Sequence, residues 1–234
     1  MKVGNSEWSN FLTKHAKGFD ISLNRTQGQL FSIYAIELIK WTQKINITAI
    51  TDPIDIATKH FIDSLIPARF ISPEAELLDI GSGGGFPGIP LKVLLPNLSV
   101  TLIDASRKKI SFLKHVIRTL QLVDIDALHV RAEELAHLPN QMNRYDVVIS
   151  RALSSLDSFV PLALPLLTDD GIVMAMKGEL KKTELDLLQR YLRFKDIAGT
   201  SNRRYRISVE KYTLPVVNSK RSIVTLNNLG HGSD

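Results

Sequence analysis

The chain has 234 residues, 44% of them hydrophobic and 23% charged, which is the composition of a soluble globular protein with a sizeable core. Cysteine is absent, and this excludes disulfides, thiolate metal sites and a cysteine nucleophile. Lysine and arginine outnumber aspartate and glutamate by 29 to 24, and the net charge of +5 favours a polyanionic partner only weakly.

Neither a membrane protein nor a metalloprotein is expected. The longest apolar run, FVPLALPLL, has nine residues with two prolines and cannot cross a bilayer, and the N-terminal stretch lacks the apolar core of a signal peptide. The six histidines never lie three to five residues apart, so helical metal pairs are not predicted. We therefore expect a cytoplasmic protein with no metal and no membrane partner.

The first 71 residues are predicted to form a helical segment that packs on the rest of the chain. The expected helices cover 6–17, 27–44 and about 53–70. Apolar residues recur in the second helix at intervals of three and four, as on a buried helix face: Leu30, Tyr34, Leu38 and Trp41. We expect a sheet domain at 72–228 and a short tail at 229–234.

From residue 72 onward, strands and helices alternate. Five strands are predicted at 76–80, 99–105, 126–130, 145–150 and 171–177. The helices between them are a short one that ends before Pro96, one at 106–121 capped by Ser106, and two at 155–166 and 180–193. Residues 203–214 and 221–228 are predicted as an antiparallel pair. This alternation is typical of an α/β protein with a mostly parallel, doubly wound sheet and helices on both faces.

A glycine-rich turn follows the first predicted strand in the stretch LLDIGSGGGFPGIPL, residues 77–91. Gly81, Gly83 and Gly85 permit positive φ and let a ligand approach the backbone. In an open parallel sheet, ligands bind beyond the carboxyl ends of the strands, which is where this turn lies. The stretch therefore predicts a ligand site, with an idle flexible turn as the alternative.

Two classes of ligand fit the glycines. A dinucleotide fingerprint, G-x-G-x-x-G, can be read from Gly83 to Gly88, with Asp104 as its acidic residue. That register leaves two residues unexplained between strand and turn, and it places Phe86 and Pro87 where a helix should open under a pyrophosphate. A carboxylate at position 79 would also repel a pyrophosphate.

The other register, Leu77 to Gly85, resembles the first motif of the S-adenosylmethionine-dependent methyltransferases of the seven-stranded class. The ligand implied by this resemblance carries ammonium and sulfonium cations and no phosphate, so a carboxylate at Asp79 suits it. Asp104, at the end of the second strand, is placed to accept the two ribose hydroxyls. The alternative for Asp104 is an acidic cap on the following helix. We favour the methyltransferase register.

Longer motifs narrow the resemblance. In order along the chain they are KWTQKINITAI, KHFIDSL, GSGGGFPGIPLKVLLPN, LIDASRKKISFLKHV, RAEEL, YDVVISRALSSL and ALPLLTDDGIVMAMKG. Together they resemble the RsmG family, also called GidB, over roughly residues 37–226. The chain departs from the family pattern at Gly84, at LSSL and in its last residues, which lack the usual basic finish.

The resemblance implies the class I methyltransferase fold with an N-terminal helical extension. It also implies methylation of N7 of one guanine in the 530 loop of bacterial 16S ribosomal RNA, with S-adenosylmethionine as donor. The expected partner is 16S ribosomal RNA or a precursor of the small subunit, and the enzyme is expected to be a monomer. Family cofactor positions carry over to Gly81, Phe86, Ala132, Glu133 and Arg151, and the argument above adds Asp79, Gly83, Gly85 and Asp104.

The residues agree with chemistry at N7. After the fourth strand the chain has Ile149–Ala152 instead of the Asn/Asp-Pro-Pro-aromatic motif common in enzymes that methylate exocyclic amines. Methylation at cytosine C5 would need a cysteine. Guanine N7 has an in-plane lone pair and no proton to lose, so alignment suffices, and alignment alone can supply roughly 7–11 kcal/mol. We predict no catalytic acid or base.

Four cations at this rim of the sheet are candidates for RNA phosphates: Lys108, Arg131, Arg151 and Lys177. The alternative for each is a salt bridge with Glu133, Asp104 or Asp146. Because the methylated base is a cation, an arginine within about 6 Å would oppose it by roughly 3 kcal/mol at an effective dielectric constant near 20. The base is therefore expected on an uncharged surface, with Phe86 or the region of Ser150 as candidates.

Other polar residues carry weaker predictions. His60 and Asp63 are expected to serve helix packing rather than catalysis, and Lys114 and Arg118 to form a solvated helix face. Three arginines near the end either contact RNA or serve as strand-edge charge: Arg203, Arg204 and Arg206. Two other functions stay open, namely a methyltransferase of another RNA or small molecule, and a non-catalytic nucleotide- or RNA-binding module.

Overall fold

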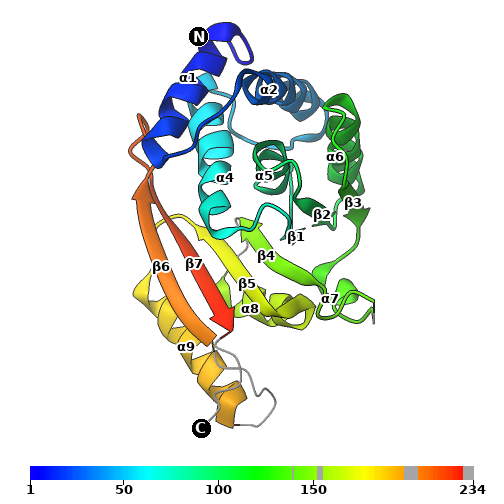
Figure 1. The fold of residues 1–234 in the computed structure, drawn as a ribbon, viewed down its shortest axis with the longest axis vertical. Helices are drawn as coiled ribbons and strands as arrows, with labels where there is room; N and C mark the ends of the chain where they lie inside the picture. The colour runs from blue at the N-terminus through cyan, green and yellow to red at the C-terminus, as the bar shows by residue number, and fades with distance from the viewer. Residues whose placement is uncertain (139, 152–154, 198–204, 229–234) are drawn as a thin grey trace.

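The computed structural model describes residues 1–138, 140–151, 155–197 and 205–228. Some sequence predictions lie outside these residues, namely those for Ala152, Arg203, Arg204 and the tail at 229–234. Figure 1 shows a central sheet, with the N-terminal helices gathered beyond one end of its strands and further helices against its faces.

The sheet has seven strands in the described part of the chain, in the order β3-β2-β1-β4-β5-β7-β6. Their bounds are β1 Glu76–Ile80, β2 Ser99–Asp104, β3 Ile125–His129, β4 Tyr145–Arg151, β5 Leu167–Lys177, β6 Tyr205–Thr213 and β7 Lys220–Asn228. β1 to β5 are parallel, and β7 pairs antiparallel with both β5 and β6. This confirms the predicted α/β fold and its antiparallel ending.

The longer helices agree with the sequence pattern. They are α1 Ser6–Ala16, α2 Arg25–Ile45, α5 Gly88–Leu94, α6 Arg107–Thr119, α8 Leu156–Ala163 and α9 Lys182–Ile197. The short α7, Ala132–Leu135, was not predicted. Ser106 accepts a hydrogen bond from the backbone amide of Lys109, as predicted for the cap of α6. Asn24 and Gln27 form a reciprocal capping box at the start of α2.

The segment predicted as one helix at 53–70 is helical but not uniform. It runs through α3 Pro53–Asp55, the π-helical η2 Ile56–Ile62, α4 Asp63–Leu65 and the 3₁₀ segment η3 Ile66–Phe70. Short π-helical segments occur frequently at functional sites. Here the π-helical turn carries Lys59 and His60, both of which contact Arg151.

β5 begins earlier than predicted. Its pairing with β4 shifts register, because Tyr145 pairs with Leu167 whereas Val147 pairs with Ile172. The extra residues form a bulge that includes Asp169, Asp170 and Gly171, a sequence typical of a turn.

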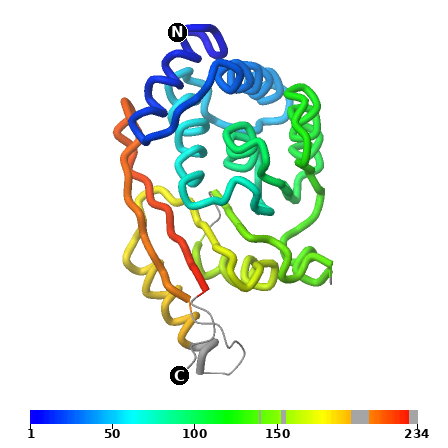
Figure 2. Tube along the Cα trace, in the orientation of Figure 1, coloured from blue at the N-terminus to red at the C-terminus, as the bar shows by residue number. Residues whose placement is uncertain are grey.

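Apolar side chains cover both faces of the sheet, as a parallel sheet requires. Leu77 and Leu78 are both fully buried and belong to different core clusters, one on each face. The first cluster contains side chains of the N-terminal helices as well as of β1, so the two parts of the chain share a core. The tube in Figure 2 shows the blue and cyan N-terminal segments beside α5 and α6.

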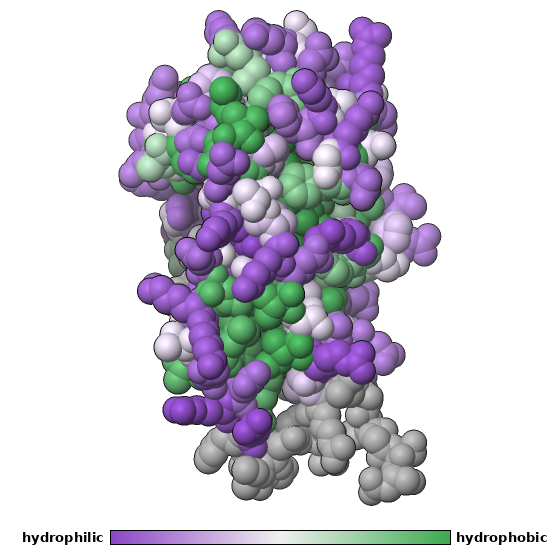
Figure 3. Space-filling view, turned by 90° about the vertical axis from the view of Figure 1, so that its left-hand side faces the viewer, coloured by the Kyte–Doolittle hydropathy of each residue, from purple (hydrophilic) through white to green (hydrophobic). Residues whose placement is uncertain are grey.

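One outer face is partly apolar. Figure 3 shows hydrophobic side chains in the lower half of the face that carries β6 and α9, with hydrophilic residues around them. Leu187 and Val209 are among the exposed apolar side chains of these two elements.

Within the described residues, the helices are too short or too polar to cross a membrane.

Candidate cofactor and acceptor site

The carboxyl ends of the parallel strands meet at one edge, and the glycine turn lies there. Gly81, Gly83 and Gly85 have φ values of 71°, 58° and 87°, a region that side chains rarely adopt. A Cβ at Gly85 would lie 2.6 Å from both Ile89 Cδ1 and Tyr34 Oη, so this glycine is required by packing. Of the atoms in the described residues, a Cβ at Gly83 would meet only the Gly81 carbonyl oxygen, at 3.8 Å, so the turn is open to a ligand at that point.

Asp79 lies fully buried beneath this turn. Its Oδ2 accepts the backbone amide of Gly88, the first residue of α5, at 2.9 Å, and within the described part of the chain its Oδ1 has no hydrogen-bond partner. Burial raises the pKa of Asp79 to about 7, although the Gly88 amide and Arg151 oppose the rise. A carboxylate with a free oxygen under an open turn fits a cationic ligand.

The same contact disfavours the dinucleotide register. In that register a pyrophosphate would bind the first amides of the helix, but Asp79 already occupies the amide of Gly88. Gly88 is also explained by packing, because a Cβ there would lie 2.3 Å from Leu102 Cδ2.

Asp104 connects the glycine turn to α6. Its Oδ2 accepts the amide of Gly83 at 3.0 Å, its Oδ1 accepts the amide of Ser106 at 2.8 Å, and Lys109 Nζ lies 3.9 Å from Oδ2. The alternative predicted for Asp104, an acidic cap on the following helix, is therefore partly correct, because Asp104 accepts the amide of Ser106, the N-cap residue of α6. A carboxylate has about four acceptor positions, so both oxygens keep capacity for ribose hydroxyls.

Phe86, the residue after the turn, is buried in an aromatic stack. Its ring is nearly parallel to those of Tyr34 and His60, with centroids 5.1 and 4.7 Å away, and Arg151 Cζ lies 5.0 Å from its centroid. The hydroxyl of Tyr34 donates to the carbonyl oxygen of Gly84. The N-terminal segment thus fixes both Phe86 and the turn.

Arg151 is held by residues of the N-terminal segment. Its Nη1 donates to the Lys59 carbonyl oxygen at 2.8 Å and to Ser64 Oγ at 3.4 Å, and its Nη2 lies 3.3 Å from His60 Nδ1. Burial and the nearby Arg151 lower the pKa of His60 to about 3. These interior contacts do not support the prediction that Arg151 binds RNA phosphate, and they leave it beside Phe86 as a candidate for the cofactor.

Asp63 joins three elements. Its Oδ1 accepts the hydroxyl of Tyr212 at 2.7 Å, and its Oδ2 lies 3.4 Å from Arg221 Nε and 3.7 Å from Arg151 Nη1. Burial raises the pKa of Asp63, and Arg151 offsets part of that rise. His60 and Asp63 therefore join their helical segment to the sheet as polar partners of Arg151, whereas the sequence predicted helix packing and indicated no such partner.

The remaining predicted residues are two candidates for cofactor binding and three cations. Ala132 and Glu133 begin α7, directly after β3, with Ala132 buried and Glu133 exposed. Lys108 and Arg131 are exposed at the same rim. Lys177 instead pairs with Glu184 at 2.9 Å. The salt-bridge alternative is thus realised for Lys177, with a carboxylate that was not among the candidates.

Neither candidate for an uncharged base-binding surface presents an open face. Phe86 is only 4% exposed, and Ser150 is 3% exposed with its hydroxyl donating to the Ile80 carbonyl oxygen. A surface for the acceptor base must be found elsewhere at this edge.

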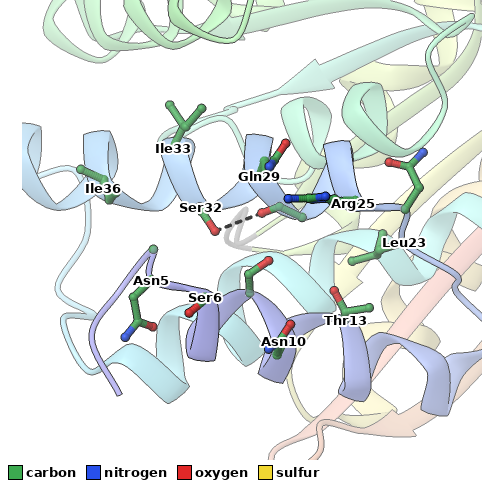
Figure 4. A pocket seen from close by; sticks show the side chains of 14 residues that line it. Asn5, Ser6, Asn10, Thr13, Leu23, Arg25, Gln29, Ser32, Ile33 and Ile36 are labelled. Atoms are coloured by element: carbon green, nitrogen blue, oxygen red, sulfur yellow. Dashed lines mark hydrogen bonds between the residues drawn. The ribbon is translucent and has the colours of Figure 1, made fainter.

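Two cavities bear on the site. One of about 370 Å³ lies at the ends of β4 and β5 and includes Arg151 and Lys177 in its wall. A larger groove of about 730 Å³ lies between α1 and α2, where Figure 4 shows mostly uncharged polar side chains, with Arg25 as the cation. The larger groove contains none of the strand-end residues, so the smaller cavity is the candidate for chemistry.

In the described residues no cluster of histidine and acidic side chains could hold a metal ion.

Comparison with known proteins identifies the family. The sequence matches the GidB family, described as rRNA small subunit methyltransferase G, over residues 27–205. The chain belongs to this family. A GidB relative from Geobacter sp. (strain M21), named ribosomal RNA small subunit methyltransferase G, is 41% identical over 215 residues, which cover 92% of this chain and 95% of that protein. One of the same name from Geotalea uraniireducens is 47% identical over 169 residues, covering 71% of this chain and 76% of that protein.

Solved structures confirm the fold of this GidB protein. A SAM-dependent methyltransferase from Aquifex aeolicus superposes with a TM-score of 0.54 at 15% identity, covering 78% of this chain and 97% of that chain. TYW2 of M. jannaschii, crystallised with AdoMet, gives a TM-score of 0.55 at 17% identity, covering 72% of this chain and 76% of that chain. Both show the predicted class I methyltransferase fold.

Proposed function

We propose that the protein transfers a methyl group from S-adenosylmethionine to N7 of one guanine in the 530 loop of bacterial 16S ribosomal RNA. Membership of the GidB family supports small-subunit ribosomal RNA as the substrate. The observation that carries the donor is the buried Asp79, with its unpartnered oxygen under an open glycine turn. A diphosphate would be repelled there, whereas a cationic ligand would be stabilised.

The residues at this edge suit the parts of the donor. S-adenosylmethionine supplies a methyl group on a positively charged sulfur. The backbone of Gly81, Gly83 and Gly85 would lie against it, over the charge of Asp79. Asp104 would accept the ribose hydroxyls. Because Asp104 pairs with the last residue of β3, the base of the nucleoside would lie next to the start of α7, at Ala132 and Glu133. Phe86 and Arg151 would border the amino-acid end.

The acceptor needs alignment rather than proton transfer. Guanine N7 attacks with its own lone pair and loses no proton, so we assign no catalytic acid or base. The chain's contribution is to hold the donor and the base in line and to exclude water, and such positioning can supply roughly 7–11 kcal/mol. N7 lies in the deep, narrow groove of paired RNA, so an unpaired loop is the accessible target. We expect a cytoplasmic enzyme that acts as a monomer.

A deletion strain tests this function. Nucleosides from 16S ribosomal RNA of the parent, the deletion strain and the complemented strain would be compared by mass spectrometry. We expect loss of one N7-methylguanosine on deletion and its return on complementation, with fragment mapping to the 530 loop. Unchanged N7-methylguanosine would refute the proposal and favour another substrate. Calorimetry with S-adenosylmethionine and with NAD separates an enzyme from a dinucleotide-binding module.

A further inference from the structure

We propose that the cavity at the ends of β4 and β5 receives the guanine that accepts the methyl group. This assignment rests on the proposed function. The cavity has a volume of about 370 Å³, within the range of small-molecule sites. Nine described residues line it: Ile50, Lys59, His60, Asp63, Arg151, Met176, Lys177, Gly178 and Arg221.

The cavity adjoins the glycine turn through one aromatic ring. His60 and Arg151 belong to its wall, and both lie about 5 Å from the ring of Phe86, at 4.7 and 5.0 Å from its centroid. Phe86 directly follows Gly85 of the turn. A base in the cavity would therefore be a neighbour of a ligand on the turn, as transfer between the two requires.

The charges of the wall suit an uncharged base better than a phosphate. Four cations line the cavity, but each has a carboxylate partner. Lys59 pairs with Asp55 at 2.8 Å and Lys177 with Glu184 at 2.9 Å. Arg151 and Arg221 share Asp63, at 3.7 and 3.4 Å. A phosphate would have to compete with these carboxylates for each of the four cations.

The wall also suits the product. Methylation leaves the base positively charged, and Asp63 is the carboxylate among the nine described lining residues. Burial and the contact with Arg151 lower the pKa of His60 to about 3 and keep its ring neutral, so it adds no charge beside the product. Ile50 and Met176 supply the apolar part of the wall.

Gly178 provides a way to fill the cavity without disturbing the fold. Among the described residues, a Cβ at Gly178 would meet no atom within 4 Å, and Gly178 lines the cavity, so we expect a leucine there to reach into its space. Among the described residues, a Cβ at Gly18, in the 3₁₀ turn after α1, would also meet no atom within 4 Å, and Gly18 is not one of the nine described residues that line the cavity. Gly18→Leu is therefore the matched control.

The experiment measures methyl transfer from labelled S-adenosylmethionine to 16S ribosomal RNA and to small subunits from a deletion strain, with the full chain. Calorimetry gives the Kd of the donor, filter binding gives the Kd of the RNA, and the Tm verifies folding. For Gly178→Leu we expect kcat to fall about tenfold or more, with both Kd values and the Tm close to wild type. Gly18→Leu should match wild type throughout.

Other outcomes overturn the assignment. Full activity of Gly178→Leu would show that the base binds elsewhere. A weaker donor Kd would place part of the cofactor in the cavity. A weaker RNA Kd with a smaller salt dependence would make it a phosphate site. Wild-type protein that fails to methylate either RNA substrate would refute the proposed function itself, which separates that failure from failure of the cavity assignment.

Discussion

Arg151 donates a hydrogen bond to Nδ1 of His60, with 3.3 Å between Nη2 and Nδ1. A guanidinium has no acceptor, so Nδ1 must be unprotonated, and the proton of the neutral ring lies on Nε2. Nε2 lies 2.8 Å from the hydroxyl oxygen of Thr48, which completes the arrangement. The imidazole therefore acts as a neutral acceptor that holds the guanidinium beside Phe86.

His60→Asn should make the protein less sensitive to acid. In the unfolded chain His60 takes up a proton below about pH 6.5, whereas burial lowers its pKa in the folded protein to about 3. The contribution to stability is present above pH 6.5 and is lost as the pH falls toward 3, by up to roughly 5 kcal/mol. Between pH 7 and 4 the Tm of the variant should fall less than that of wild type. The exposed His137→Asn variant is the control, and a parallel fall in all three proteins would contradict the prediction.

Asp79→Asn should stabilise the protein at high pH. Burial raises the pKa of Asp79 to about 7, so its contribution to stability is present below about pH 4 and is lost as the pH rises through 7. Ionised Asp79 opposes folding by up to roughly 4 kcal/mol. Asparagine resembles the protonated acid. The difference between the Tm of Asp79→Asn and the Tm of wild type should therefore increase from pH 4 to pH 8. The exposed Asp126→Asn is the control, and a constant difference would refute the predicted titration.

Binding of S-adenosylmethionine should release protons near neutral pH. A cation on the glycine turn favours the ionised form of Asp79, whose pKa is about 7 in the free protein. Affinity should therefore rise about tenfold per pH unit below pH 7 and level off above it. Calorimetry in buffers of different ionisation enthalpy counts the protons. Asp79→Asn should bind S-adenosylmethionine at least about tenfold more weakly. The number of protons released when this variant binds gives the contribution of the ligand's own ionisable groups. Equal proton release by both proteins would count against this role.

Lys108 and Arg131 should contribute to RNA affinity through phosphates. Both are exposed at the ligand-bearing rim, whereas Lys177 is paired with Glu184. Replacing either Lys108 or Arg131 by glutamine should weaken RNA binding a few-fold and reduce the slope of log K against log salt by about 1. The measurement is RNA affinity from 50 to 200 mM KCl. Lys114→Gln, on the exposed face of α6, should keep the wild-type slope, and an unchanged slope in the two rim variants would show that the RNA passes elsewhere.

The sequence predicts those features of the fold and the site that depend on nearby residues. The first strand is observed at its predicted bounds, Glu76–Ile80, because an apolar run and a glycine turn delimit it on their own. The glycines of the turn adopt the positive φ that their position indicates. The place of Asp79 at the strand end predicts a cationic ligand, and the structure adds its burial and its contact with Gly88. These features depend on neighbours within about a dozen residues.

Contacts between distant segments were not predictable from one sequence. Arg151 meets His60 across 91 residues, and Tyr212 meets Asp63 across 149. No local spacing in the sequence indicates such pairs. The position of Arg151 at a strand end therefore predicted a phosphate contact, although the residue has partners in the interior. The bulge in β5 was missed because its sequence, Asp169–Gly171, has the composition of a turn.

The aromatic and polar contacts of the N-terminal segment limit how the enzyme can be dissected. Tyr34 holds the Gly84 carbonyl, and Lys59, His60 and Asp63 hold Arg151. A truncated gene that starts at β1 would uncover one side of Phe86 and leave a guanidinium in the interior without its partners. For protein engineering, the smallest transferable catalytic module thus includes the N-terminal helices. A chimaera that replaces them must supply equivalent contacts to Phe86, Gly84 and Arg151.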